Sequence, residues 1–83
     1  MQKLRPDMEI GINIQAIRRQ NALTQEEVTA QLQLMGLNIT RSTYAKIERN
    51  AYNIRISELV ALKIIFKQNS FDPFFAGLDQ WVE

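Results

Sequence analysis

The sequence predicts an all-α fold, a compact bundle of five short helices in a single domain that covers residues 1–83. Apolar residues recur at helical spacing in several segments, residues that cap helices precede them, and no segment alternates as a strand does. With 83 residues, 46% of them hydrophobic, the chain can bury one small core. Helices are expected at 8–20, 24–34, 41–49, 57–68 and 73–81.

The first two helices have the clearest patterns. Ile10, Ile14 and Ile17 follow at i, i+4 and i+7, which forms one apolar stripe on a helix. Thr24 and Glu27 have the spacing of a capping box, in which each side chain binds the backbone amide of the other residue. The second helix is therefore expected to begin at this threonine.

The third and fourth helices are predicted mainly from their ends. Thr40 is the expected N-cap of the third helix, and Tyr44 and Ile47 are its expected inward pair. Asn50 follows as a residue that tolerates the left-handed conformation common after a helix. Ser57 is the expected N-cap of the fourth helix.

The last segment is rich in aromatic residues. An aspartate followed by Pro73 is typical of a helix start, because proline suits the first helical position. Its apolar side chains divide between two expected uses. Phe66, Phe71 and Phe75 are expected to close the core of the monomer, and Phe74, Leu78 and Trp81 are candidates for a self-association face.

Histidine and cysteine are both absent, which excludes disulfides, thiolate nucleophiles and Cys/His zinc sites. No metal or cofactor is expected, and the acidic pairs Glu26–Glu27 and Asp72–Asp79 are interpreted as solvated helix termini, not as catalytic groups. The longest apolar runs fall far short of the about 20 residues that span a bilayer, so no membrane partner is expected. A cytoplasmic binding module, not an enzyme, is the expectation.

Charge is distributed unevenly, although the net charge is only +1. Six basic residues lie within 41–67, where only Glu48 and Glu58 oppose them. The residues from 68 onward carry three acidic side chains and no basic one. A local excess of this kind can attract phosphate even when the whole molecule is nearly neutral.

The middle of the sequence has the layout of a helix-turn-helix. It consists of a capped helix, a turn that contains glycine, and a second capped helix with a small, polar outer face. Residues 10–66 resemble the phage-repressor and Cro type of this domain, often called the XRE family. The resemblance rests on Ile10-Gly11 with Ile14, Ile17 and Arg18, on Leu23-Thr24-Gln25-Glu26-Glu27-Val28, on Ile39-Thr40-Arg41-Ser42-Thr43-Tyr44 and on Lys46-Ile47-Glu48-Arg49-Asn50.

This resemblance implies a sequence-specific regulator of transcription, repressor-like, that binds double-stranded DNA as a homodimer with helix 41–49 in the major groove. The chain departs from the family's pattern at Thr29, Tyr44 and Asn50, and its turn at 33–39 is longer, which can rotate the reading helix. Each site residue could instead belong to an ordinary solvated surface. An alternative is a protein-interaction module, such as an antitoxin-like partner, that uses the aromatic C-terminal segment.

The resemblance also assigns roles to individual residues. Arg18 and Glu48 would form a partly buried ion pair between the first and third helices. Base edges would be read by Arg41, Ser42, Thr43 and Lys46. Phosphates would be bound by Gln25, Thr40, Arg49, Asn50, Asn53 and Arg55.

Overall fold

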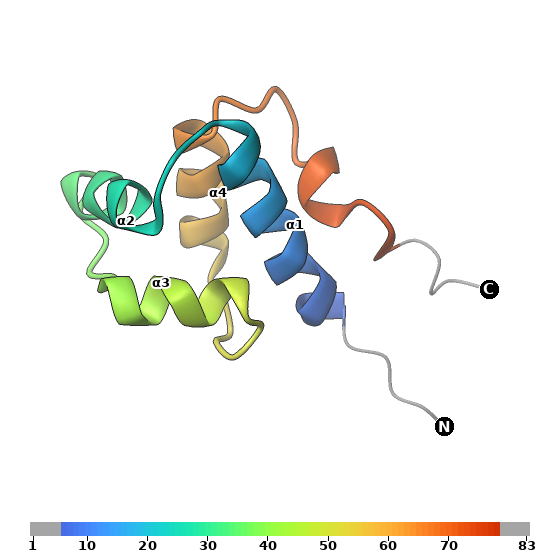
Figure 1. Cartoon of the computed structure of the whole chain (residues 1–83), viewed down its shortest axis with the longest axis horizontal. Helices are drawn as coiled ribbons and strands as arrows, with labels where there is room; N and C mark the ends of the chain where they lie inside the picture. Colours follow the sequence, from blue (N-terminus) through green and yellow to red (C-terminus); the bar gives the residue numbers. More distant parts are fainter. Residues whose placement is uncertain (1–5, 79–83) are drawn as a thin grey trace.

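A computed structural model describes residues 6–78 and shows a compact helical bundle (Figure 1). No strand occurs within that range, which confirms the all-α prediction. The helix count differs, because four α-helices are followed by a single 3₁₀ turn where a fifth helix was expected. The elements are α1 (Pro6–Gln20), α2 (Gln25–Leu34), α3 (Arg41–Glu48), α4 (Ile56–Ile65) and η1 (Asp72–Phe75).

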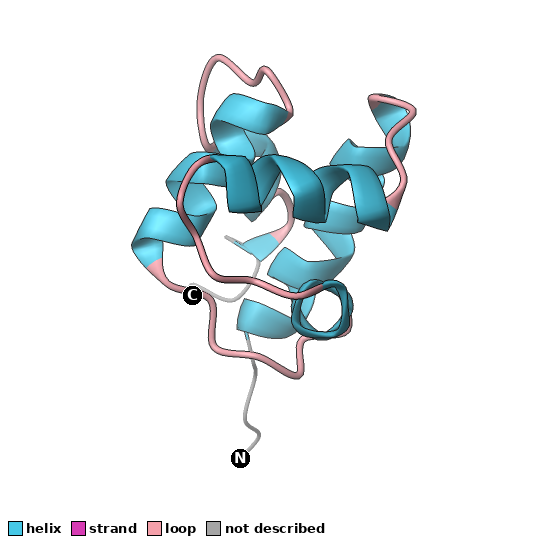
Figure 2. Cartoon of the chain, turned by 90° about the vertical axis from the view of Figure 1, so that its left-hand side faces the viewer, coloured by secondary structure: helices cyan, strands magenta, loops and turns pink. Residues whose placement is uncertain are grey.

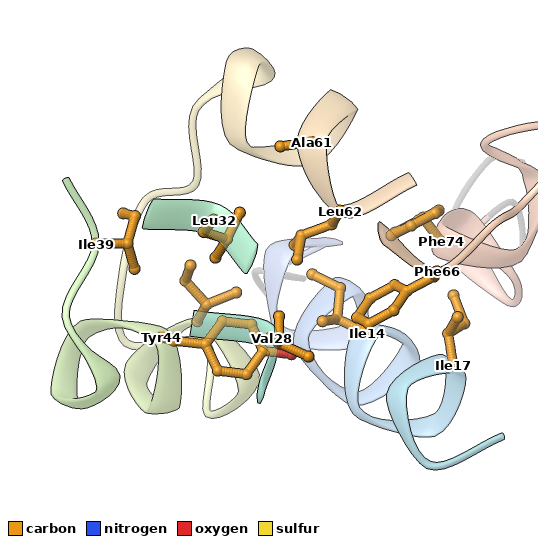
Figure 3. Close-up of a cluster of buried hydrophobic side chains, with 11 residues drawn as sticks. Ile14, Ile17, Val28, Leu32, Ile39, Tyr44, Ala61, Leu62, Phe66 and Phe74 are labelled. Atoms are coloured by element: carbon orange, nitrogen blue, oxygen red, sulfur yellow. The ribbon is translucent and has the colours of Figure 1, made fainter. Parts of the chain in front are cut away.

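Two helices connect the parts of the bundle. α1 packs against both α3 and η1, and α2 packs against both α3 and α4. Asn13 strengthens the contact between α1 and η1. Its side-chain amide donates to the carbonyl oxygens of Phe74 at 2.9 Å and Ala76 at 3.0 Å. A single core fills the space between the helices (Figure 3), and its buried members include Ile14, Val28, Leu32, Tyr44, Leu62 and Phe66.

The predicted caps of α2 and α3 are confirmed. Thr24 accepts a hydrogen bond from the Glu27 amide at 3.0 Å, and the Glu27 carboxylate accepts one from the Thr24 amide at 2.8 Å. Thr40 accepts from the amide of Thr43 at 3.1 Å. Asn50 has a φ of 62°, the left-handed conformation expected after α3.

The boundaries of two other helices need correction. α1 begins at Pro6, two residues earlier than expected, because proline suits the first turn. α4 is capped at Arg55 and not by Ser57, since the Arg55 amide donates to Glu58 at 2.8 Å. The same helix ends at Ile65, before the expected 68, and the left-handed φ of 56° at Lys67 prevents its continuation.

The predicted helix at 73–81 is wrong within the described range. Only η1 forms, and it is followed by Ala76 with an extended ψ of 129° and by Gly77 with a φ of 86°. Both conformations are incompatible with a continuing right-handed helix. The predicted end at 81 lies outside the described residues.

This change of structure also reverses the expected uses of two aromatic residues. Phe74 is fully buried, with ring centroids 6.3 Å from Phe66 and 6.1 Å from Phe71, so it belongs to the core and cannot form a self-association face. Phe75 is 41% exposed and does not close the core. Leu78 is half-buried, and Trp81 lies outside the described residues.

Candidate nucleic-acid interface

The candidate reading helix, α3, lies at an edge of the molecule. Figure 2 shows it end-on at the lower edge, with α2 crossing above it. At about 100° per residue, positions 41, 42, 45, 46 and 49 share one arc of the helix surface. Arg41, Ser42, Lys46 and Arg49 are exposed on that arc, and Thr43 at its border is half-buried.

The opposite arc of α3 anchors the helix to the domain. Tyr44, Ile47 and Glu48 are buried there. Because the inward and outward arcs do not overlap, the polar side chains of α3 project from the surface without displacing the core. The amino-terminal end of α3 is therefore open to a large partner.

The surface around α3 is more basic than the sequence count indicates. The only acidic residues within 40–67 are Glu48 and Glu58, which are 5% and 4% exposed. Neither carboxylate is at the surface. Of the five exposed basic side chains in this stretch, Arg41, Lys46, Arg49 and Arg55 lie on α3 or in the loop after it, and Lys67 lies at the distant end of α4. The nearest exposed carboxylates on a helix packed against α3 are Glu26 and Glu27, in the first turn of α2.

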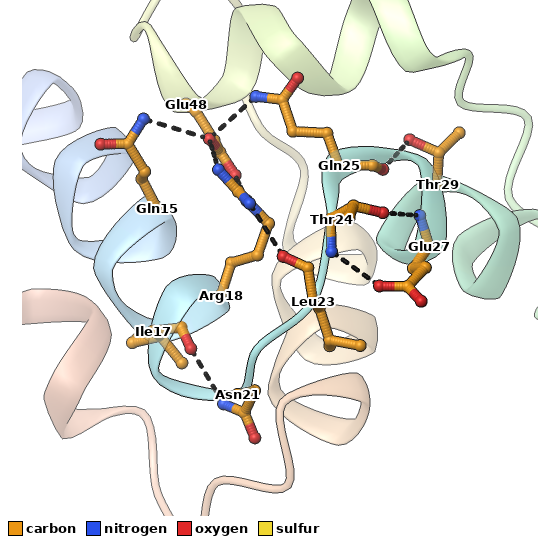
Figure 4. A network of polar contacts seen from close by, with 10 residues as sticks. All are labelled: Gln15, Ile17, Arg18, Asn21, Leu23, Thr24, Gln25, Glu27, Thr29 and Glu48. Carbon is orange, nitrogen blue, oxygen red and sulfur yellow. Dashed lines mark hydrogen bonds and ion pairs between the residues drawn. The ribbon is translucent and has the colours of Figure 1, made fainter.

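Glu48 lies at the centre of a polar network that joins three helices (Figure 4). Its carboxylate accepts from Arg18 twice, from Nε at 2.6 Å and from Nη2 at 3.1 Å. Gln25 of α2 donates to it at 3.0 Å, and Gln15 of α1 donates at 3.4 Å. Arg18 also donates to the carbonyl oxygen of Leu23 at 2.9 Å. The predicted ion pair is therefore present and extends further than expected.

The network shifts the pKa values of its members. Burial alone would raise the pKa of Glu48, but the hydrogen bonds from Arg18 and Gln25 outweigh it and lower that pKa below its ordinary value. The carboxylate in turn raises the pKa of Arg18. Burial, followed by the nearby Glu48, raises the pKa of Tyr44. Glu48 thus stays ionised and paired under α3.

Several predicted phosphate-binding residues already have partners within the fold. Gln25 is bound to Glu48, and the Thr40 hydroxyl contacts both the amide and the hydroxyl of Thr43. Asn50 accepts from the Gly11 amide at 2.8 Å through Oδ1. For these three residues, positioning α3 is the role that the geometry shows.

The remaining phosphate candidates, Arg49, Asn53 and Arg55, are exposed. They occupy the end of α3 and the loop that leads to α4. Together with Arg41 and Lys46, they place exposed polar or basic groups along α3 and beyond its carboxyl end. This arrangement can contact a continuous polyanionic surface.

The turn between α2 and α3 is long but anchored. Gly36 takes a φ of 89°, which a side chain would strain, and Ile39 is buried in the core. Gln33 of α2 donates to the carbonyl oxygen of Ile39 at 3.0 Å. These contacts fix the position at which α3 begins.

Two contacts in the structure were not predicted from the sequence. Gly11 is buried against α3, where an added Cβ would overlap Asn50 Oδ1 and lie 2.7 Å from the Ile47 carbonyl oxygen. Tyr52 donates to the buried Glu58 carboxylate at 2.9 Å. The position of Glu58 three residues after Arg55 could have indicated the bond from the Arg55 amide, but no local pattern indicates the contact with Tyr52.

The part of the chain that the structure describes has no group of three acidic side chains placed to hold a metal ion. Within residues 6–78, no helix combines the length and apolar character that crossing a bilayer requires. Comparison of the chain with protein-family models, curated proteins and solved structures gave no match. The functional argument therefore rests on the residues and their geometry.

Proposed function

We propose that the chain is a sequence-specific double-stranded DNA-binding regulator, repressor-like and of the phage-repressor and Cro (XRE) helix-turn-helix type. The observation that carries the proposal is the exposed arc of α3, which has Arg41, Ser42, Lys46 and Arg49 at the surface. Glu48 lies on the buried side of the same helix. A helix of this kind fits the major groove of B-form DNA.

Arg41 and Ser42 in the first turn of α3, together with Lys46 in its last turn, supply the base contacts in this proposal. Arg41 and Lys46 have donors that suit the O6 and N7 acceptors of guanine, and each such contact contributes about 1–3 kcal/mol of discrimination. Ser42 can donate to or accept from a base edge. Thr43, half-buried and bonded to Thr40, is assigned to the border of the reading surface.

Phosphate contacts would fix the register of the protein on the duplex. Arg49, Asn53 and Arg55 are the exposed candidates, and the amides at the amino-terminal end of α2 are a further anion-binding group. Gln25 and Asn50 would act indirectly, by holding the helices that carry these groups. Such contacts raise affinity for DNA of any sequence.

Homodimerisation remains part of the proposal, since two copies would bind two half-sites and bury enough surface for specific binding. Phe74 is excluded from the dimer face by its burial. The rival function, a protein-interaction module that uses the aromatic C-terminal segment, would have to use the exposed Phe75 and not the buried Phe74. We propose a cytoplasmic, non-enzymatic role for the chain.

Selection of bound fragments from a random pool of duplex DNA tests this function. The wild-type chain is expected to enrich one motif, and the Lys46→Ala variant is expected to relax the preference at one or two positions of that motif. Arg19→Ala, which removes an exposed base at the far end of α1, is the matched control and should select the wild-type motif. Failure to enrich any motif would contradict sequence-specific binding.

A further inference from the structure

A second surface, on the exposed face of α4, is apolar and extends from the loop after α3 to the end of α4 that lies far from α3. Three side chains of α4 form a stripe at i, i+4 and i+8: Ile56 is 81% exposed, Val60 is 40% exposed and Ile64 is 58% exposed. We call these residues the α4 stripe. Aliphatic residues at this spacing are normally buried. The exposure of three of them on one helix face therefore marks a contact surface.

The carboxyl-terminal end of the α4 stripe opens into a groove between α2 and α4. The groove has a volume of about 450 Å³ and is lined by Leu23, Gln31, Met35, Ile64, Ile65 and Lys67, with Asn21 at its edge. Met35 is itself 42% exposed. Figure 1 shows that this end of α4 lies far from α3, so a partner here leaves the reading helix free.

Charge decides which occupant fits the groove and the α4 stripe. Lys67 lines the groove, Lys63 lies one turn earlier on α4, and Arg55 precedes the other end of the stripe. The lining includes no acidic residue, and Glu58, the only acidic residue of α4, is buried. The surface is thus apolar with a basic border on the α4 side, whereas on α2 the exposed Glu27 lies one turn before Gln31.

A second copy of the chain fits this surface poorly. An antiparallel pairing of two α4 stripes about Val60 would bring Arg55 of one copy towards Lys63 and Lys67 of the other, with no exposed acidic residue of α4 to separate them. Like charges that face each other across an interface disfavour association. A flat membrane surface also fits poorly, because the groove is concave.

We propose that the α4 stripe and the α2–α4 groove bind an amphipathic helix of a partner protein, with an apolar face flanked by Asp or Glu. The apolar side chains of that helix enter the groove beside Met35 and Ile64, as in other helix-in-groove complexes. Its carboxylates pair with Lys67 and Arg55 at the two ends. The groove end of this surface lies away from α3, and only Arg55 is shared with the proposed phosphate contacts, so a peptide can bind here whether or not the chain binds DNA.

A labelled, designed peptide tests the proposal on the full chain by fluorescence anisotropy. The probe is a 16-residue helix with leucine at i, i+3, i+4 and i+7 and glutamate on both flanks, and the control peptide has lysine in place of every glutamate. The glutamate peptide is expected to bind about tenfold more tightly than the lysine peptide. Equal binding of the two peptides, or no binding, would overturn the proposal.

Variants locate the binding surface. Ile64→Ser is expected to weaken binding of the glutamate peptide about tenfold because it removes buried apolar area, and Lys67→Glu is expected to weaken it as well. Ile12→Ser is the matched control, since Ile12 is 62% exposed on α1 and should leave binding unchanged. Circular dichroism checks that each variant is folded.

Two further outcomes would assign the surface differently and so contradict the proposal. Sedimentation that shows a dimer of the wild-type chain, lost in Ile64→Ser, would assign the surface to a second copy. Binding to vesicles of anionic phosphatidylserine, lost in the same variant and unaffected by the glutamate peptide, would assign it to a lipid surface.

Discussion

Arg18 of α1 holds Glu48 of α3 through two hydrogen bonds, at 2.6 Å from Nε and 3.1 Å from Nη2. The Glu48 side chain is only 1% exposed, and the Arg18 side chain is 11% exposed. The pair therefore joins α1 to α3, the helix proposed to read DNA. These two hydrogen bonds hold the inward arc of α3 in one orientation relative to α1.

Removal of the acidic partner should destabilise the domain. Glu48→Ala leaves the Arg18 guanidinium without its partner in a partly buried site, and we expect a loss of about 3 kcal/mol in the free energy of unfolding. Urea denaturation measures it. In the Arg18→Ala background the same substitution should cost clearly less, and equal costs in both backgrounds would contradict a direct interaction.

Stability should fall in acid because of the same carboxylate. The pKa of Glu48 is lowered by folding, so its contribution is present above the unfolded pKa of about 4.3 and is lost as the pH falls through the lower, folded pKa. The stability difference between wild type and Glu48→Gln should therefore shrink between pH 6 and pH 3. A difference that stays constant over this range would mean that Glu48 titrates normally in the folded protein.

The contact between Gly11 and Asn50 should tolerate no added methyl group. Gly11→Ala gains helix propensity but places a Cβ against Asn50 Oδ1 and the Ile47 carbonyl oxygen, so we expect a net loss of about 1–2 kcal/mol. Thermal denaturation measures this loss. Asn50→Gly removes the Oδ1 atom and should relieve part of the cost of Gly11→Ala, whereas strict additivity of the two substitutions would exclude the contact.

Two tyrosines form a matched pair of tests. Among the described residues, the buried Tyr44 hydroxyl has no hydrogen-bond partner, whereas the Tyr52 hydroxyl donates to Glu58 at 2.9 Å. Tyr44→Phe should therefore leave stability unchanged or raise it slightly, and Tyr52→Phe should lower it by about 1 kcal/mol. Urea denaturation of the two variants compares them directly. The reverse order would show that the Tyr44 hydroxyl is bonded to Glu48.

Local chemistry made the starts of α2 and α3 predictable from the sequence. Thr24 with Glu27 and Thr40 bind amides within three residues of themselves, so their roles depend little on the rest of the fold. Asn50 was predictable for a similar reason, because few residue types tolerate a positive φ. The error at Ser57 arose because Glu58 provides the other half of a capping box, starting at Arg55.

The C-terminal segment was harder to predict because its helical period changes. An α-helix has 3.6 residues per turn and a 3₁₀ turn has about 3, so the faces assigned to Phe74 and Phe75 on α-helical spacing were exchanged. The core side of this segment is set by contacts with α1, including those of Asn13, which are distant in sequence. Neighbouring residues alone do not contain that information.

For the candidate site, the resemblance indicated which residues of α3 would face outward, and the exposure of Arg41, Ser42 and Lys46 agrees with it. The burial of Glu58 could not be inferred, because its partner Tyr52 lies in an irregular loop whose course depends on the whole fold. Long-range contacts such as Gly11 with Asn50 are equally absent from any local pattern.

The most direct test of DNA recognition by α3 is a salt titration of binding to the duplex motif obtained by selection. Fluorescence anisotropy of the labelled duplex measures the binding. Affinity should fall steeply with salt, with a log–log slope of about −0.9 for each phosphate neutralised, and Arg49→Ala should make that slope shallower by about one unit. Arg41→Ala should reduce discrimination between the motif and a scrambled duplex about tenfold or more, while Arg19→Ala changes neither quantity. An affinity that is independent of salt, or Arg41→Ala and Arg49→Ala variants that bind as Arg19→Ala does, would contradict the account.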